Sequence, residues 1–351
     1  MDRTGNRAGA GPPGTRRLDR RELLAGLTRP GAERGGHWIR VHRPAMACRF
    51  EVTLGSEDAR FVPAARAALD EVDALERALT VFRDSSELAR VNRHAAAGPV
   101  GVSTGLWDLL GLCRDLHAAT GGAFDPTSTP LSREWGFLTR EGRVPSAEQI
   151  EATRARVGMG RVVLDEADRS VSFASPGVEL NLGSIGKGWA LDRIASGLRS
   201  RGLHHALVSA GGSSFLGWGG RDWAVTLRPG REPLADLRLR RAALGTSGAG
   251  EQHFEVDGRR FGHVIDPRTG TPAEGILSAS AVTASAATAD ALATAFLVGG
   301  TPLARSYCTE HPGTVAILVF EEDPRAIVVY GSRAGSAIEP AAGIRLATGE
   351  S

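Results

Sequence analysis

A single lysine, Lys187, lies in the glycine-rich segment 181–188, between an apolar run and an amphipathic stretch. Every other cation of the lysine and arginine class is an arginine. An ammonium is a compact charge that enters a narrow anionic pocket, whereas a guanidinium is a planar fork that needs more room. Glycines let a backbone approach a ligand, and a helix start supplies N–H groups, so the segment suits a pyrophosphate. Its spacing matches neither the Walker A nor the Rossmann motif, and a lysine at a solvated helix start remains the alternative.

A second candidate site combines Asp290 with Thr294. The two residues are four positions apart, which places a carboxylate and a hydroxyl on one helix face. Both are hard oxygen ligands of the kind that magnesium or calcium prefers over zinc. An aspartate near an alanine-rich helix start is also a common partner of the helix dipole, so that interpretation stays open.

Two further loops carry polar residues suited to an anionic ligand. The segment 261–270 places His263 before a turn that contains Arg268, and a histidine there would accept a proton near neutral pH. The segment 122–127 contains Asp125 followed by proline and threonine. Either segment is also a good turn sequence without further function, and the residues alone do not choose between the two interpretations.

Length and charge place the chain among globular proteins. Its 351 residues carry a formal net charge of +2, but residues 1–43 hold ten arginines against four acidic residues. We expect residues 1–37 to form a disordered, solvated leader rich in Arg, Gly and Pro rather than a segment that binds nucleic acid or anionic lipid. Nothing downstream resembles a nucleic-acid-binding module. One integrated domain is expected over 38–332 and a loosely ordered tail over 333–351.

Cysteines and apolar runs bear on the compartment. The three cysteines are widely spaced, which indicates neither a disulfide framework nor a zinc site. No apolar run approaches the roughly 20 residues of a membrane span, so no stable membrane insertion is expected. Residues 15–24 are similar to a twin-arginine export signal, yet no continuous apolar segment or cleavage site follows. We therefore expect a cytoplasmic protein, with export as a lesser alternative.

Hydrophobic periodicity predicts an α+β fold with mixed or antiparallel sheets and segregated helices. Helices are expected from Pro63, from 84–87 to Asn92, from Ser103 to the Gly121-Gly122 pair, over 189–198, and over 287–298 with Gly299-Gly300 as cap. The predicted strands are 46–54, 162–164, 171–173, 178–182, 206–209, 223–227, 242–246, 254–256, 263–265, 315–320 and 326–330.

Taken in order, these segments resemble the FAD:protein FMN transferases, also called the ApbE family. The resemblance spans about Met46 to Gly300. It rests on the Met46 strand opening, Phe82-x-x-x-Ser86-Glu-Leu-x-x-x-Asn92, Gly122-x-Phe-Asp-x-Thr127, Trp135-Gly-Phe137, Leu182-Gly-x-Ile-x-Lys-Gly-x-Ala-x-Asp192, Gly211-Gly212, Thr246-Ser-Gly248, His263-x-Ile-Asp-Pro-Arg-Thr-Gly270 and Ala289-Asp-Ala-x-Ala-Thr294.

The resemblance implies an enzyme that uses Mg²⁺ to cleave FAD and attaches FMN to a Thr or Ser hydroxyl of an acceptor flavoprotein, releasing AMP. It implies a metal site of Asp290, Thr294 and the backbone oxygen of Ser184. It assigns Lys187 to the FAD phosphates and His263 to the role of base, so that His263, Lys187 and Asp290 form the catalytic set. The residues implied in cofactor binding are Met46, Phe82, Ala123, Phe124, Asp125, Asn181, Lys187 and Val264.

Three positions depart from the family pattern. Asn181 stands where the family often has aspartate, Ala47-Cys48 replaces a Gly-Thr pair, and Phe82 replaces a frequent tyrosine. The Asn181 change removes a negative charge beside the lysine and the metal. Two other functions therefore stay open, namely an FAD pyrophosphatase that gives FMN and AMP, and a non-catalytic FAD-binding protein.

Overall fold

The computed structural model describes residues 37–228, 232–250 and 252–349. The leader expected over 1–37 therefore lies, apart from His37, outside the described residues. The largest sheet of the described fold has the strand order β1-β2-β6-β7-β10-β15-β16-β17-β19, in which only the β17–β19 pair is parallel. The strands are β1 (Trp38–Ala45), β2 (Cys48–Gly55), β6 (Ala206–Ala210), β7 (Ser214–Trp218), β10 (Ala242–Gly248), β15 (Ile276–Thr283), β16 (Val315–Phe320), β17 (Ala326–Tyr330) and β19 (Arg345–Thr348).

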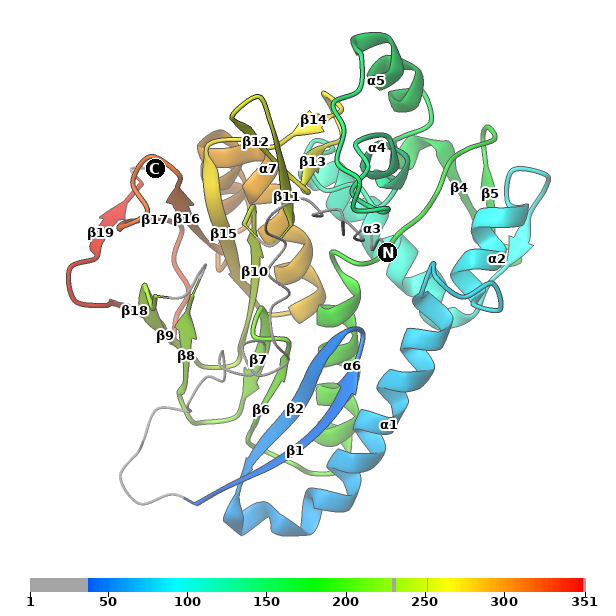
Figure 1. Ribbon diagram of the computed structural model, residues 1–351. Helices are drawn as coiled ribbons and strands as arrows, with labels where there is room; N and C mark the ends of the chain where they lie inside the picture. The colour runs from blue at the N-terminus through cyan, green and yellow to red at the C-terminus, as the bar shows by residue number, and fades with distance from the viewer. Residues whose placement is uncertain (1–36, 229–231, 251, 350–351) are drawn as a thin grey trace, which may run out of the picture.

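Helices cover one face of this sheet and a smaller sheet covers the other (Figure 1). The alternation is visible in β6, where Val208 packs with the helices and Leu207 packs with the small sheet. The helices are α1 (Val62–Leu79), α2 (Glu87–His94), α3 (Thr104–Ala119), α4 (Thr129–Glu134), α5 (Ala147–Arg154), α6 (Gly186–Ser200) and α7 (Ala286–Glu310), with 3₁₀ turns η1 (Ser56–Phe61) and η2 (Met159–Arg161). The α+β prediction is confirmed.

Four small sheets accompany the large one in the part of the chain that the structure describes. They are β8 (Trp223–Leu227) with β9 (Ala235–Leu239) and β18 (Ser336–Pro340); β4 (Val162–Asp165) with β5 (Ser170–Phe173) and β3 (Val100–Gly101); β11 (His253–Val256) with β12 (Arg259–Gly262); and β13 (Ile265–Asp266) with β14 (Thr271–Pro272). Two of the last strands, β18 and β19, lie beyond Ser332. The prediction of a loosely ordered tail is wrong over 333–349, because both strands pair with the body of the fold.

Several predicted boundaries were wrong for identifiable reasons. The strand predicted over 46–54 begins at Cys48, because Met46 and Ala47 form a hairpin turn with φ of 47° and 57°. The strand predicted over 263–265 shrinks to Ile265–Asp266. The helix predicted to stop at Val298 bends at Gly300, where φ is 57°, and then runs on to Glu310.

The strand predicted over 178–182 is absent from the described residues because a side chain takes the place of its partner strand. Asn92 Nδ2 donates to the Leu180 carbonyl at 2.9 Å, and Leu180 N–H donates to Asn92 Oδ1 at 2.8 Å. Asn181 N–H then donates to the Pro126 carbonyl at 2.8 Å. The chain that leads to the lysine loop is thus fixed by α2 and by the 122–127 loop.

Replacing Asn92 by alanine is expected to destabilise the protein by about 2 kcal/mol, because two hydrogen bonds are lost and Leu180, which is fully buried, keeps its polar groups without those partners. Urea unfolding would measure the change. Arg93→Ala is a suitable control, since Arg93 bonds the exposed Asp84 and should cost less than about 0.5 kcal/mol. Equal losses in the two variants would show that the Asn92 bridge does not hold this segment.

Candidate functional site

The Asp290 carboxylate lies at the meeting point of α6, α7 and β7. Its Oδ2 accepts a hydrogen bond from the Gly188 backbone N–H at 2.7 Å, and its Oδ1 accepts one from the Ser214 hydroxyl at 2.7 Å. The residue is only 6% exposed. Two donors therefore fix the carboxylate plane, and each oxygen keeps a second lone pair for another partner.

Close contact between the two helix starts makes this arrangement possible. A Cβ placed on Gly188 would lie 2.1 Å from the Ala286 carbonyl oxygen, so only glycine allows α6 and α7 to meet here. Asp192 joins the same two helices, since its carboxylate accepts from the backbone N–H groups of Ala286 and Ala287, both at 2.9 Å. The start of α7, which carries Asp290, is thus anchored to the helix that follows the lysine loop.

Charge is concentrated at this junction. Burial raises the pKa of Asp290 to about 6, although the Lys187 ammonium and the two hydrogen bonds oppose the shift. Cys48 lies nearby, against Gly211, and burial raises the pKa of its thiol to about 11. The thiol is therefore neutral at physiological pH. The carboxylate, by contrast, gains stabilisation from any added cation.

The predicted ligand set has the chemistry that Mg²⁺ requires. Thr294 lies one turn beyond Asp290, and its hydroxyl shares a hydrogen bond of 2.9 Å with the Ser247 hydroxyl. The hydrogen-bond ladder of α6 begins at the Ile185 carbonyl, so the Ser184 carbonyl lies just outside it. Within the described residues no group of three or more His, Cys, Asp or Glu side chains is placed to hold a metal. A cation here would rest on one carboxylate and neutral oxygens, as hard divalent ions with phosphate ligands do.

Ser214 is a residue that the sequence did not single out. It is fully buried on β7, and its donation to Asp290 limits how the carboxylate can rotate. Ser214→Ala should weaken Mg²⁺ binding roughly tenfold, the usual effect of removing an outer partner of a ligand. The measurement is the Mg²⁺ concentration that gives half of the maximal thermal stabilisation. Ser278→Ala, at a buried serine on β15 of the same sheet, is the matched control, and a similar shift in both would argue against a specific role of Ser214.

The Asn181 side chain closes a local turn in the lysine loop. Its Oδ1 accepts from the Gly183 N–H at 2.9 Å. An aspartate at this position has the same acceptor, so the departure from the family pattern leaves the course of the loop intact. What changes is one negative charge close to Lys187.

The expected cofactor residues divide into exposed and buried groups. Phe82 is 83% exposed and offers a whole aromatic face, whereas Met46 is half-buried at the β1–β2 turn. Ala123 and Phe124 are each 1% exposed as whole residues, so both are buried. Val264 is half-buried, in the segment that connects β12 to β13.

His263 is oriented by the backbone of a neighbouring segment. Its ring Nδ1 lies 3.2 Å from the Gln252 carbonyl oxygen, and the backbone N–H of His263 donates to the same oxygen at 3.0 Å. A carbonyl only accepts, so Nδ1 carries a proton. In the neutral ring the basic lone pair is then on Nε2.

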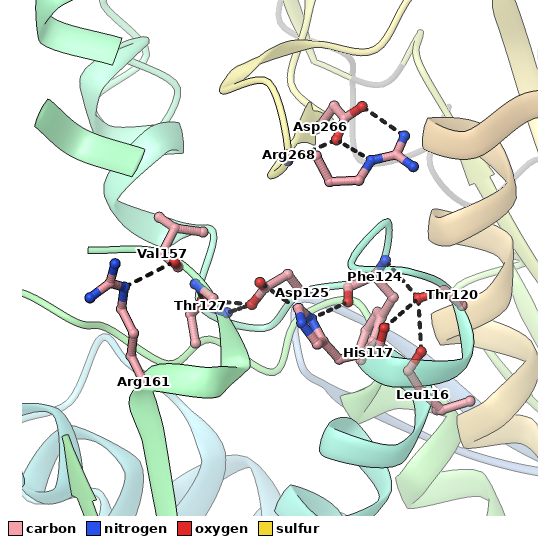
Figure 2. Close-up of polar contacts among 11 residues, drawn as sticks. Leu116, His117, Thr120, Phe124, Asp125, Thr127, Val157, Arg161, Asp266 and Arg268 are labelled. Atoms are coloured by element: carbon pink, nitrogen blue, oxygen red, sulfur yellow. Dashed lines mark hydrogen bonds and ion pairs between the residues drawn. The ribbon is translucent and has the colours of Figure 1, made fainter. Parts of the chain in front are cut away.

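The 122–127 loop and the turn between β13 and β14 lie close together. Figure 2 shows Asp125 between Thr127 and His117, with the Asp266–Arg268 pair on the other loop. A Cβ placed on Gly122 would lie 3.7 Å from Arg268 Cγ. Trp135 Nε1 adds a bond of 2.8 Å to the Gly270 carbonyl. The structure therefore brings together two of the polar loops that the sequence singled out. It also places Lys187 within reach of the Asp290 charge and Thr294 one turn beyond Asp290.

Comparisons with known proteins identify the family of this chain. Residues 46–319 match the ApbE family. A FAD:protein FMN transferase of Vibrio cholerae is 29% identical over 318 residues, covering 86% of this chain and 92% of the relative. One of Treponema pallidum is 34% identical over 281 residues, covering 73% and 78%.

Solved structures show the same fold. The ApbE protein of Thermotoga maritima superimposes with a TM-score of 0.75 at 28% identity, covering 87% of this chain and 97% of its own. The apo flavinyl transferase ApbE of Pseudomonas stutzeri gives a TM-score of 0.71 at 26% identity, covering 88% and 96%. Because the family match covers residues 46–319, which is most of the chain, the chain belongs to the ApbE family.

Proposed function

We propose that this chain is an FAD:protein FMN transferase, which moves FMN from FAD to a threonine or serine hydroxyl of an acceptor flavoprotein and releases AMP. The observation that carries the proposal is the Asp290 carboxylate, which is buried, oriented by two donors and coupled to the charge of Lys187. The names of the relatives in Vibrio cholerae and Treponema pallidum support the same reaction class.

In the proposed reaction the acceptor hydroxyl oxygen forms a bond to the FMN phosphorus. The bond between that phosphorus and the bridging pyrophosphate oxygen breaks, and the electron pair leaves with AMP. The hydroxyl proton passes to a base, for which we propose Nε2 of His263, since Nδ1 faces a carbonyl. Atoms and charges balance without any redox step.

The chain's own groups position the phosphates and neutralise their charge. Lys187 supplies one positive charge beside the glycine loop, at the positive end of the α6 dipole. We propose that Asp290, Thr294 and the Ser184 carbonyl hold Mg²⁺, which when bound withdraws charge from the pyrophosphate oxygens. Phosphoryl transfer depends more on such positioning than on covalent catalysis, so this set is sufficient.

For the flavin and adenine we propose contacts with Met46, the exposed face of Phe82, the segment Ala123–Asp125, Asn181 and Val264. The aromatic ring of Phe82 suits stacking on a planar ligand. Its phenyl ring lacks the hydroxyl that the family often has, so recognition there would rest on stacking alone.

The decisive experiment incubates the purified protein with FAD and Mg²⁺, with and without an acceptor domain that contains a Thr or Ser target segment. AMP release and acceptor mass are followed together. AMP formed in step with an acceptor mass gain of one FMN phosphoester supports transfer. AMP formed at the same rate without acceptor labelling indicates an FAD pyrophosphatase, and FAD binding without AMP indicates a non-catalytic binding protein; either result overturns the proposal.

Within the described residues no helix is both long and apolar enough to cross a membrane. We propose that the chain acts in the cytoplasm, for the reasons given from the sequence. Fractionation of cells that express the full chain would test this location, and recovery of the protein outside the cytoplasmic fraction would contradict it.

A further inference from the structure

His263, the base that we propose, follows a hairpin that pairs with no other sheet. Within the described residues its strands, β11 and β12, pair only with each other. One further backbone bond extends the hairpin, from the His263 N–H to the Gln252 carbonyl at 3.0 Å, and the ring Nδ1 lies 3.2 Å from the same oxygen. A two-stranded hairpin alone is only marginally stable in water. The direction of that carbonyl, and of the ring that it holds, therefore depends on contacts from outside the hairpin.

The segment 135–137, which follows α4, supplies these contacts. Phe261 of β12 packs on Trp135 with ring centroids 5.4 Å apart, and Phe254 of β11 packs on Phe137 at 5.3 Å. Such burial of apolar surface holds the hairpin against the segment, but it is non-directional and does not fix how one carbonyl points. A hydrogen bond is needed to fix that direction.

Gln252 makes this hydrogen bond with its side chain. Its Nε2 donates to the Phe137 carbonyl at 2.8 Å. A carbonyl only accepts, so the amide nitrogen rather than the amide oxygen must face it, and the orientation of the side chain is defined. Gln252 therefore binds Phe137 with its side chain and His263 with its backbone.

The Phe137 carbonyl is itself held in place. Gly136 has φ of 75°, and a Cβ there would lie 2.5 Å from a backbone oxygen, so the turn at 135–137 requires glycine. The Trp135 indole donates to the Gly270 carbonyl at 2.8 Å. The segment is therefore bonded to the chain on both sides of His263, and it gives the glutamine amide a fixed partner.

We propose that Gln252 is a positioning residue for transfer. Its amide, bound to Phe137, sets the direction of the Gln252 carbonyl, which keeps the proton of the His263 ring on Nδ1 and directs Nε2 towards the acceptor hydroxyl. The inference rests on the proposed function, because it takes Nε2 as the base. Without the amide, kcat for transfer should fall roughly tenfold because the base is misplaced, whereas KM for FAD should stay within about twofold, since the base acts on the acceptor hydroxyl.

Gln252→Met tests the inference with little change of shape, because methionine has a similar length and no donor. Gln149→Met is the matched control, since Gln149 is the only other glutamine of the sequence, is exposed, and accepts from the Ser146 N–H. Steady-state transfer is measured on the full chain with FAD, Mg²⁺ and an acceptor domain that contains a Thr or Ser target segment. We expect the fall in kcat in Gln252→Met alone.

Two kinetic results would overturn the inference. An unchanged kcat in Gln252→Met would show that the amide is dispensable. A rise in KM for FAD as large as the fall in kcat would show a general loosening of the structure rather than a misplaced base.

Nitrogen-15 NMR of the histidine rings gives a second reading that needs neither FAD nor acceptor. The His263 signals are identified by their loss in His263→Asn. At a pH where the ring is neutral, the native protein should show the tautomer with the proton on Nδ1, and Gln252→Met should show a mixture of both tautomers. An unchanged tautomer in Gln252→Met also overturns the inference. The expected change of tautomer in a protein that releases no AMP from FAD would retain the hold of Gln252 on the ring and refute the proposed function instead.

Discussion

Asp290→Asn should remove flavin transfer by at least about a hundredfold while the protein stays folded. Asparagine has the same shape, its amide oxygen accepts from Gly188 N–H, and its amide group donates to the Ser214 hydroxyl. What is lost is the negative charge that would hold Mg²⁺ opposite Lys187. The measurement is the rate of AMP release at saturating FAD and acceptor.

In the absence of metal, Asp290→Asn should be more stable than the native protein, although it is less active. Burial raises the pKa of Asp290 from 3.8 to about 6, so ionisation of the carboxylate destabilises the fold as pH rises from about 4 to 6, and the cost remains above that range. Removing the charge should therefore raise the free energy of unfolding by up to about 3 kcal/mol at pH 8 and by nearly nothing below pH 4. Urea unfolding in EDTA measures both.

The matched control is Asp236→Asn, which makes the same chemical change on an exposed strand position that bonds Thr226. It should alter neither transfer nor the pH dependence of stability. Retained Mg²⁺-dependent transfer in Asp290→Asn would refute the assignment of the metal site, and a stability curve parallel to that of the native protein would refute the argument from burial.

Gly188→Ala should destabilise the protein by at least about 3 kcal/mol. The added methyl group would lie 2.1 Å from the Ala286 oxygen, 2.4 Å from its carbonyl carbon and 2.7 Å from Ala287 N. All three are backbone atoms at the start of α7, so no side chain can rotate away, and the two helices must separate. Because Gly188 N–H also holds Asp290, Mg²⁺ binding should be lost together with stability.

Gly186→Ala tests whether this effect is specific to the contact. A Cβ on Gly186 meets nothing within 4 Å, and alanine is the better helix former in the first turn of α6. Its free energy of unfolding should equal or exceed that of the native protein. If both variants lose stability equally, flexibility of the loop rather than the packing of α6 on α7 explains the glycines.

Sequence patterns of a few residues correctly predicted helix caps, helix ends and side chains that share one helix face. Ser103 caps α3 by accepting from Leu106 N–H, and the Gly121-Gly122 pair ends that helix region, as expected from turn and cap preferences. The i, i+4 spacing also placed Asp290 and Thr294 on one side of α7, where the Thr294 hydroxyl lies 3.4 Å from the Asp290 carbonyl. These predictions depend on a few neighbouring residues.

What the sequence did not predict depends on distant partners. Strand β15 is rich in Ser and Ala and has a weak strand pattern, yet it is central to the sheet, where small side chains such as Ala279 and Ala281 lie under the helices. Ser214 gave no signal because its role exists only when Asp290 lies against it. The segment 178–182 has a strand composition, but Asn92 on α2 replaces the strand partner.

The junction at Asp290 also has a consequence for folding. Its two donors lie 102 and 76 residues away along the chain, and Thr294 bonds a residue 47 positions away. Contacts of such long range form late, after the loops between them have closed. A chain still being synthesised, or one that has lost the segment after β10, therefore holds the glycine loop without its carboxylate. With Asp290 in its proposed role, incomplete chains would not cleave FAD, and cleavage would begin only after the strands around Asp290 have assembled.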